Sequence, residues 1–320
     1  MKRAFATGCA AAAMAAVMTV TAAGCAQETR SAGHGGDGGS PGPSAGGARP
    51  EPLTWQQELR VSDALQRLTG RCMKRHGFAY GEDRTLSLRE SMPVRYVQDD
   101  VAWARTYGYG GRIDAGLEQR RLHNPTAAYR QGLSPARRAA FDTALDGDGG
   151  DVQVLTARLP GGSREVRKRL GGCTAEAEKA LYGDPGAWFR ASKAAGGLNA
   201  LYADDLLHDR QLTAAVAAWS RCMKKAGLSY ADPQAARDAI RANTALLGPS
   251  GSGKAFAAER TTAVADATCA RATSLRAVAT ARETHYVDRL PKRYGKALDT
   301  FRRLQRQAYD RAVHIVPQRA

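Results

Sequence analysis

The sequence is short of acidic residues, and it lacks the usual signatures of zinc sites and of two hydrolase classes. Its 47 lysines and arginines face only 31 aspartates and glutamates, so the net charge at pH 7 is +16. No Cys-x-x-Cys pair occurs, which argues against a zinc site of the common structural type. Outside the Gly-rich segment near the N-terminus there is no Gly-x-Ser-x-Gly, and His-Glu-x-x-His is absent throughout.

Long apolar runs are also absent, with one exception at the N-terminus. After Met1-Lys2-Arg3, an uncharged and alanine-rich run extends to Gly24 and is followed by Cys25. A cationic start, an apolar middle and small residues at the end are typical of a secretory signal peptide. A membrane-spanning helix needs about 20 strongly apolar residues, so a run this rich in Ala, Thr and Gly would span weakly.

The end of this run resembles the lipobox of bacterial lipoproteins. In that family, small residues precede a Cys that receives a diacylglycerol, and cleavage makes this Cys the new N-terminus. Ala22-Ala23-Gly24-Cys25 has this order, although the family usually has Leu where Ala22 stands. The resemblance predicts a signal peptide over residues 1–24 and lipidation of Cys25. The alternatives are plain secretion or a spanning segment, with Cys25 incidental.

A tether follows the predicted anchor. Residues 25–52 are dense in Gly, Ser and Pro and have no large apolar side chains before Pro52. Such a segment buries too little surface to offset chain entropy, so we expect disorder. As a flexible coil it would span about 25–30 Å. Because two acyl chains anchor a protein stably, a diacylated Cys25 would hold the chain at the outer face of the cell membrane.

Two short segments repeat at an offset of 150 residues. "RCMKRHGFAY" (Arg71–Tyr80) and "RCMKKAGLSY" (Arg221–Tyr230) share Arg, Cys, Met, Lys, Gly and Tyr. We interpret them as parts of a duplicated module. Each is predicted to lie at the end of a helix, because the apolar residues before it recur at helical spacing. Gly77 and Gly227 stand where a left-handed residue ends a helix.

Four cysteines follow Cys25, and an even number in an exported protein suggests two disulfides. Four cysteines allow three pairings. If the modules are copies, Cys72 and Cys222 are equivalent, and the simplest arrangement joins Cys72 to Cys173 and Cys222 to Cys269. Free buried thiols are the alternative.

The sequence therefore predicts a mainly α fold of two disulfide-linked helical modules after a disordered tether. Module 1 would cover residues 53–183 and contain an insertion, and module 2 would cover residues 184–320. Arg164–Gly183, around Cys173, looks helical, as does the segment around Cys269. Within the insertion, Asp151–Pro160 has the composition of a short strand.

The Cys-Met-Lys-x-x-Gly pattern, with His76 in the first copy, resembles a group of actinobacterial surface lipoproteins that carry Cys-Met-x-x-His-Gly segments after a lipobox. The second copy has Ala226 in place of the histidine, so the fold does not require it. The resemblance implies a location at the cell surface and supplies no chemistry.

Three motifs look functional, but each is better explained as structure. Gly248–Lys254 fits part of a nucleotide-binding loop, but Ala255 replaces the hydroxyl that ligates Mg²⁺, and a helix is expected before it. Asp146–Asp151 lacks the Gly and Glu of a calcium loop. Asp204 and His208 lie one helical turn apart, and two ligands do not make a metal site.

No catalytic residue, cofactor site or metal ligand is assigned from the sequence. The Tyr107–Gly110 loop could line a pocket or form a turn. We expect a non-enzymatic, membrane-anchored lipoprotein that binds a protein partner or an envelope component such as an anionic cell-wall polymer, and not nucleic acid. The alternative is an envelope hydrolase with its site in the module 1 insertion. The solute-binding subunit of an importer fits less well, because few strands are expected.

Overall fold

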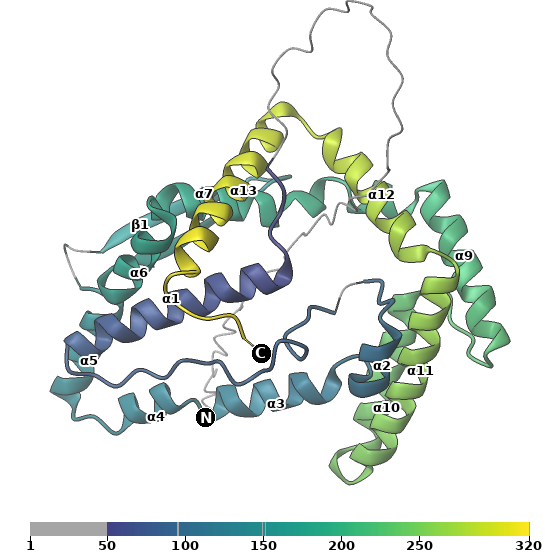
Figure 1. Cartoon of the computed structure of the whole chain (residues 1–320), viewed down its shortest axis with the longest axis horizontal. Coiled ribbons are helices and arrows are strands. Elements are labelled where there is room, and N and C mark those ends of the chain that lie inside the picture. The colour runs from purple at the N-terminus through teal and green to yellow at the C-terminus, as the bar shows by residue number, and fades with distance from the viewer. Residues whose placement is uncertain (1–49, 95, 149, 151, 320) are drawn as a thin grey trace, which may run out of the picture.

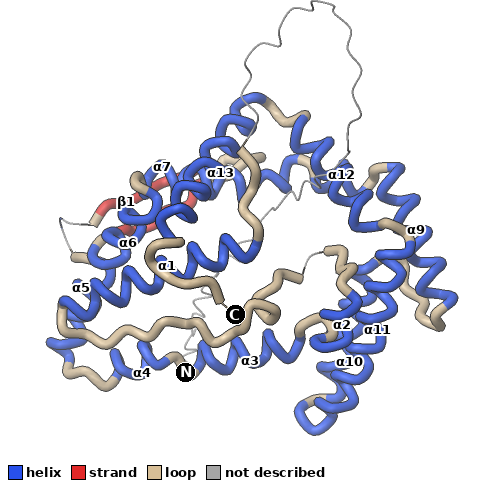
Figure 2. The backbone as a smooth tube through the Cα atoms, in the orientation of Figure 1, coloured by secondary structure: helices blue, strands red, loops and turns tan. Residues whose placement is uncertain are grey.

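The computed structural model describes residues 50–94, 96–148, 150 and 152–319, and this part of the chain is mainly helical (Figures 1 and 2). The predicted signal peptide, Cys25 and most of the tether lie outside it. No described helix is both long enough and apolar enough to cross a bilayer. The helices are α1 (Trp55–Arg75), α2 (Val101–Tyr107), α3 (Gly111–Leu122), α4 (Pro125–Gln131), α5 (Pro135–Asp146), α6 (Gly172–Tyr182), α7 (Pro185–Gly196), α8 (Ala203–Leu207), α9 (Arg210–Lys225), α10 (Pro233–Leu247), α11 (Ser252–Ala272), α12 (Leu275–Asp288) and α13 (Lys292–Ala312).

A first lobe is built around α1, α5, α6, α7 and α13 (Figure 1). α1 begins with a complete capping box: the Thr54 hydroxyl accepts the backbone N–H of Gln57, and the Gln57 side chain accepts the backbone N–H of Thr54. This satisfies donors that a helix start leaves without partners. One face of α1 is buried, including Val61 and Ala64, and packs with residues of α6 and α13. In the sequence, Thr54 and Gln57 already have the spacing of a capping box, which predicts a helix start at this point, and the structure confirms it.

A two-stranded antiparallel sheet lies against α7 in the first lobe. β1 (Gln153–Arg158) confirms the predicted short strand, and β2 (Glu165–Leu170) pairs with it. The expectation of a helix throughout Arg164–Gly183 is wrong, because Glu165–Leu170 is strand and helix α6 begins only at Gly172. Successive residues of β2 alternate between more and less exposed positions, a period of two that suits a half-buried strand.

A second lobe contains α2, α9, α10, α11 and α12. Its core is formed by Leu212, Trp219 and Met223 of α9 together with residues of α11 and α12. The sequence places Leu212, Val216, Trp219 and Met223 at helical spacing on one apolar face. Leu212, Trp219 and Met223 are buried, and Val216 is partly buried against them. α10 and α11 form a helical hairpin whose connection includes the Pro249–Gly251 turn.

The two predicted disulfides are both present. Cys72 near the end of α1 joins Cys173 at the start of α6, with the Cα atoms 5.5 Å apart. Cys222 near the end of α9 joins Cys269 near the end of α11, with the Cα atoms 5.6 Å apart. Each bond therefore links an early helix to a later one, as the repeat predicts. The second cysteines lie at opposite ends of their helices, so the two crosslinks are similar but not superimposable copies.

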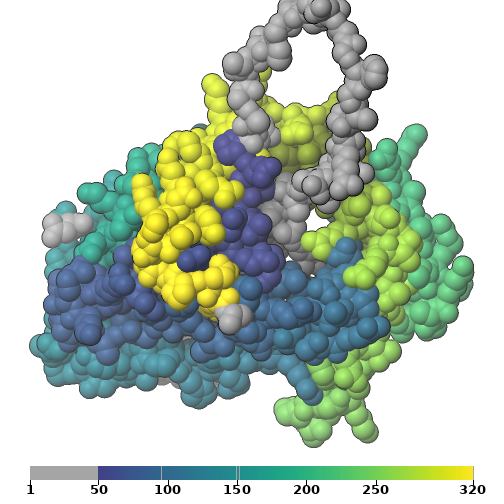
Figure 3. All heavy atoms as spheres, in the orientation of Figure 1, coloured from purple at the N-terminus to yellow at the C-terminus, as the bar shows by residue number. Residues whose placement is uncertain are grey.

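Each lobe includes an element from the other half of the chain. α13, from the C-terminal part of the sequence, packs on α1, α6 and α7. Figure 3 shows these yellow C-terminal residues lying against the purple N-terminal helix. Conversely, α2 from the predicted insertion packs on α11. The boundary at residue 183 stays a prediction, and these contacts tie the two predicted modules together on both sides of it.

Removing either disulfide should lower the free energy of unfolding. The bonds close loops with sequence separations of 101 and 47 residues. Loop-closure entropy then predicts losses of up to about 4.7 kcal/mol for the Cys72→Ala/Cys173→Ala variant and about 4 kcal/mol for the Cys222→Ala/Cys269→Ala variant. Urea denaturation of the two variants and the parent chain measures this. Unchanged midpoints would show that the crosslinks do not stabilise the fold.

Candidate functional site

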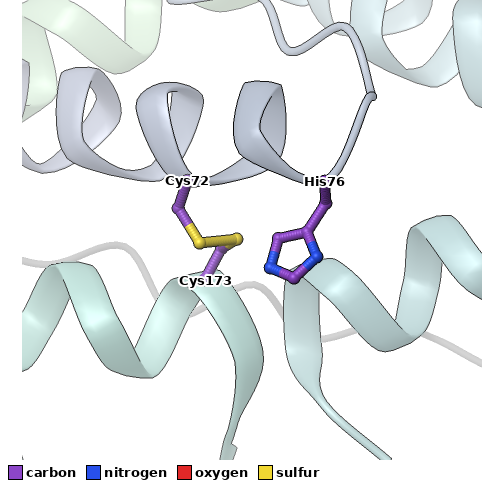
Figure 4. A group of neighbouring side chains, drawn as sticks. All are labelled: Cys72, His76 and Cys173. Atoms are coloured by element: carbon purple, nitrogen blue, oxygen red, sulfur yellow. A yellow bond between two sulfur atoms is a disulfide. The ribbon is translucent and has the colours of Figure 1, made fainter.

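His76 lies beside the first disulfide, and this group has the residue types of a metal site. His76 follows Cys72 by one turn of α1, and one nitrogen of its ring lies with both sulfurs inside a 4.8 Å cluster (Figure 4). The sulfurs are bonded to each other, however, and a metal ion binds thiolates rather than a disulfide. The exposed imidazole therefore stands next to a structural crosslink, and Ala226 occupies the equivalent position of the second copy.

The other motifs that the sequence singles out occur in loops or on exposed helix faces. The Gly248–Lys254 segment joins α10 to α11, so a helix precedes it and the strand of a nucleotide-binding loop is not there. His208 Nδ1 lies 3.7 Å from an Asp204 carboxylate oxygen, and both side chains are highly exposed. Asp146 ends α5 and accepts a hydrogen bond from Thr174 at 3.3 Å. Among the described residues, Cys72, His76 and Cys173 form the one group of three or more His, Cys, Asp or Glu residues close enough to share a metal ion, and that group includes none of these motifs.

The Tyr107–Gly110 loop is attached to α11 by two buried acids. Glu259 Oε1 accepts the backbone N–H of Tyr109 at 2.8 Å and that of Gly111 at 2.9 Å. Asp266, two helical turns further along the same face, accepts the Tyr109 hydroxyl at 3.0 Å. Gly108 has a φ of +66°, and a Cβ there would lie 2.8 Å from Glu259. The loop is therefore a structural junction between the insertion and the second lobe.

Asp266 is fully buried and has an unusual protonation equilibrium. It accepts a hydrogen bond from Trp219 Nε1 at 2.9 Å in addition to the one from Tyr109. Burial raises the pKa of Asp266 to about 6, although these hydrogen bonds and the nearby Arg237 oppose the shift. Burial and the Asp266 charge also raise the pKa of Tyr109. Because the carboxylate is 0% exposed, it cannot reach a substrate in solution, so the cluster is not a candidate active site.

An open groove of about 610 Å³ lies between α1, the segment after it and the C-terminus. Arg319 donates to the buried Asp63 through two nitrogens at 2.8 and 2.5 Å, and Arg84 reaches Asp63 at 3.3 Å. Arg67 pairs with Glu82 at 2.5 Å. These arginines neutralise carboxylates in or beneath the groove, so little positive charge remains for a ligand. The ion pairs that line the groove hold the end of the chain, through Arg319, to α1.

The feature with the clearest chemical character is the exposed positive charge. Many exposed Lys and Arg side chains form no ion pair or hydrogen bond with another described residue, and they occur on both lobes. Among the described exposed carboxylates, those without a partner are fewer, namely Glu51, Asp114, Asp205 and Asp310. The unpartnered cations include Arg71 and Lys74 on α1, Arg169 on β2, Lys224 and Lys225 on α9, and Arg303 on α13. These exposed cations without partners form the candidate interface.

The pKa of Asp266 predicts a pH-dependent stability. A folded-state pKa of about 6, well above the ordinary value for an aspartate, means that the folded chain holds this proton more tightly than the unfolded chain. The stabilisation is complete below about pH 4 and is lost as the pH rises through 6, a difference of about 3 kcal/mol. Asp266→Asn should remove this contribution.

Urea denaturation of the Asp266→Asn variant and the parent chain at pH 4, 5 and 7 measures the effect. Because other groups titrate in both proteins, the relevant quantity is the difference between them at each pH. We expect the variant to gain stability relative to the parent chain between pH 4 and pH 7. A difference that stays constant over this range would contradict the role given to burial.

Comparison with protein-family models, with curated proteins and with solved structures gives no match. Of the features described above, the buried acids hold structural elements together, and the groove arginines do so as well. The exposed cations have no such role among the described contacts, so they are the part of the structure available to a binding partner.

Proposed function

We propose that the chain is an exported, membrane-anchored lipoprotein that binds a polyanionic component of the cell envelope without catalysing a reaction. The observation that carries the proposal is the surplus of exposed Lys and Arg side chains without partners among the described residues. Cleavage before Cys25 removes Lys2 and Arg3, which lowers the net charge from +16 by two, to +14. Long-range attraction from such a surface raises the local concentration of polyanions.

Two further observations support an extracytoplasmic location. Disulfides persist in oxidising compartments and are rare in the cytosol, and both crosslinks join helices whose cysteines are mostly buried. The N-terminal sequence has the order of a lipoprotein signal, with Cys25 at its end. A lipid anchor and the tether would hold the described lobes near the membrane face, where anionic polymers and lipids are concentrated.

The anchor can be tested by changing one cysteine at a time. Cys25→Ser should move the protein from the membrane fraction to the soluble fraction, and intact-mass measurement should show loss of the added lipid. Cys9→Ser is the matched control, because Cys9 lies in the same signal segment with almost no apolar run before it. Retention of the Cys25→Ser variant in membranes, or a parent chain without lipid, would contradict the anchor.

The binding activity can be tested with purified cell wall and the chain lacking residues 1–25. Electrostatic attraction between exposed charges weakens as the Debye length falls from about 14 Å to about 4 Å between 0.05 and 0.5 M salt. We expect the affinity to fall roughly tenfold or more over that range, as measured by co-sedimentation. Neutral dextran should not compete, whereas long-chain polyphosphate should. Binding that is insensitive to salt would contradict the proposal.

A further inference from the structure

The internal repeat allows each shared residue to be compared in two structural settings. Most of the six identities between Arg71–Tyr80 and Arg221–Tyr230 have a structural reason. The shared cysteines form the disulfides, and the shared methionines, Met73 and Met223, are both 0% exposed. The shared glycines have φ values of +76° and +82°, which only glycine adopts readily. The shared tyrosines are half-buried. Packing and backbone geometry therefore account for four of the identities.

The two remaining identities are exposed cations. Arg71 and Lys74 on α1 correspond to Arg221 and Lys224 on α9, and all four side chains are exposed without a partner among the described residues. The next position is also basic in both copies, as Arg75 and Lys225. Each helix therefore ends with three cations at positions i, i+3 and i+4. We call Arg71, Lys74 and Arg75 the first triad, and Arg221, Lys224 and Lys225 the second triad.

Helix stability does not explain this arrangement. Like charges at i and i+4 destabilise a helix, and each triad contains such a pair. The helix dipole favours cations only in the last turn, whereas Arg71 and Arg221 lie a turn further back. In the first triad Arg75 pairs with Glu176, but the second triad has no acidic partner among the described residues. Both copies thus keep a locally unfavourable group of charges.

The two triads lie far apart on the molecule. In Figure 1 the last turn of α1 is at the left side of the molecule, and the last turn of α9 is at the right side. This view has the longest axis of the molecule horizontal. A ligand that contacts both triads must therefore be extended, and a small anion could occupy only one of them.

We propose that the two triads are equivalent binding points for one extended phosphate-bearing polymer, so that the chain binds it bivalently. This inference rests on the proposed function, and it assigns the binding of the polyanion to the six residues of the two triads. Charge complementarity supports a polyanion. Surfaces that insert into a lipid bilayer combine cations with exposed large apolar side chains, and none of the described exposed large hydrophobic residues lies within either repeat segment. A polymer is therefore favoured over a lipid surface.

The test compares four proteins that lack residues 1–25. They are the parent chain, a first-triad variant (Arg71→Gln, Lys74→Gln, Arg75→Gln), a second-triad variant (Arg221→Gln, Lys224→Gln, Lys225→Gln) and a control variant (Lys292→Gln, Lys296→Gln, Arg303→Gln). The control loses the same charge from exposed positions of α13 that have no partner among the described residues. Affinities are measured for long-chain polyphosphate and for tripolyphosphate, which is too short to reach both triads.

Bivalent binding raises affinity by a factor of about 100 or more over one point alone. We expect each triad variant to lose most of that factor for the long chain, and to lose at most a few-fold for tripolyphosphate. The control variant should stay within a few-fold of the parent chain for both probes. The melting temperature of the second-triad variant should stay close to that of the parent chain, because the repulsion removed within the helix offsets the lost attraction to the helix dipole. The first-triad variant also loses the exposed Arg75–Glu176 pair, so it should melt at most slightly lower. A large fall in the melting temperature of the second-triad variant would assign the triads a structural role and overturn the proposal.

The remaining outcomes separate this inference from the proposed function. If the control loses as much affinity as the triad variants, or if one triad variant binds like the parent chain, the binding points are wrong while electrostatic binding stands. Triad-dependent binding to phosphatidylglycerol vesicles with no preference for the long polymer would identify a lipid surface instead and overturn the inference. If the parent chain binds neither purified cell wall nor long-chain polyphosphate, both the inference and the proposed function fail.

Discussion

Two helix-to-helix disulfides are the constraint on which the described structure depends. Each lies at the end of a repeated Arg-Cys-Met helix and fixes that helix against a later one, α6 in the first lobe and α11 in the second. The cores around them are modest, with many alanines among the buried residues. Alanine buries little apolar area, so such cores offset less of the conformational entropy that the chain loses on folding. The disulfides reduce that loss because they restrict the unfolded chain. Because α13 packs in the first lobe and α2 packs in the second, the two crosslinked lobes are also joined by helix packing.

The sequence predicts the parts of this fold that depend on local patterns. The capping box at Thr54, the helix-ending Gly77 and Gly227 and the two cysteine pairings all have signals within a few residues or within the repeat, and the structure confirms them. The helix expected over Glu165–Leu170 is wrong, since the less exposed positions there, Val166, Lys168 and Leu170, recur with a period of two and the partner strand β1 is available. Pairing with β1 therefore makes this segment a strand and not a helix.

Other features could not be read from the sequence, because they join distant segments. The Tyr109–Asp266 hydrogen bond spans 157 residues and the Arg319–Asp63 pair spans 256. An acidic residue on a helix gives no local indication that it will be buried beside a tyrosine from an inserted loop. The candidate interface is different: the basic composition and the repeat are visible in the sequence, but only the structure separates the buried identities from the exposed ones. That separation makes the exposed cations, rather than the groove or the buried acids, the basis of the proposed function.

The central proposal is that this chain matures in an oxidising compartment, where the two disulfides of the structure form. Peptide mapping without reduction, applied to protein purified from the cell envelope, tests it most directly. The account predicts one crosslinked peptide pair containing Cys72 and Cys173 and another containing Cys222 and Cys269. Free thiols at these positions, or a peptide pair linking Cys72 to Cys222, would contradict both the crosslinked fold and the proposed location.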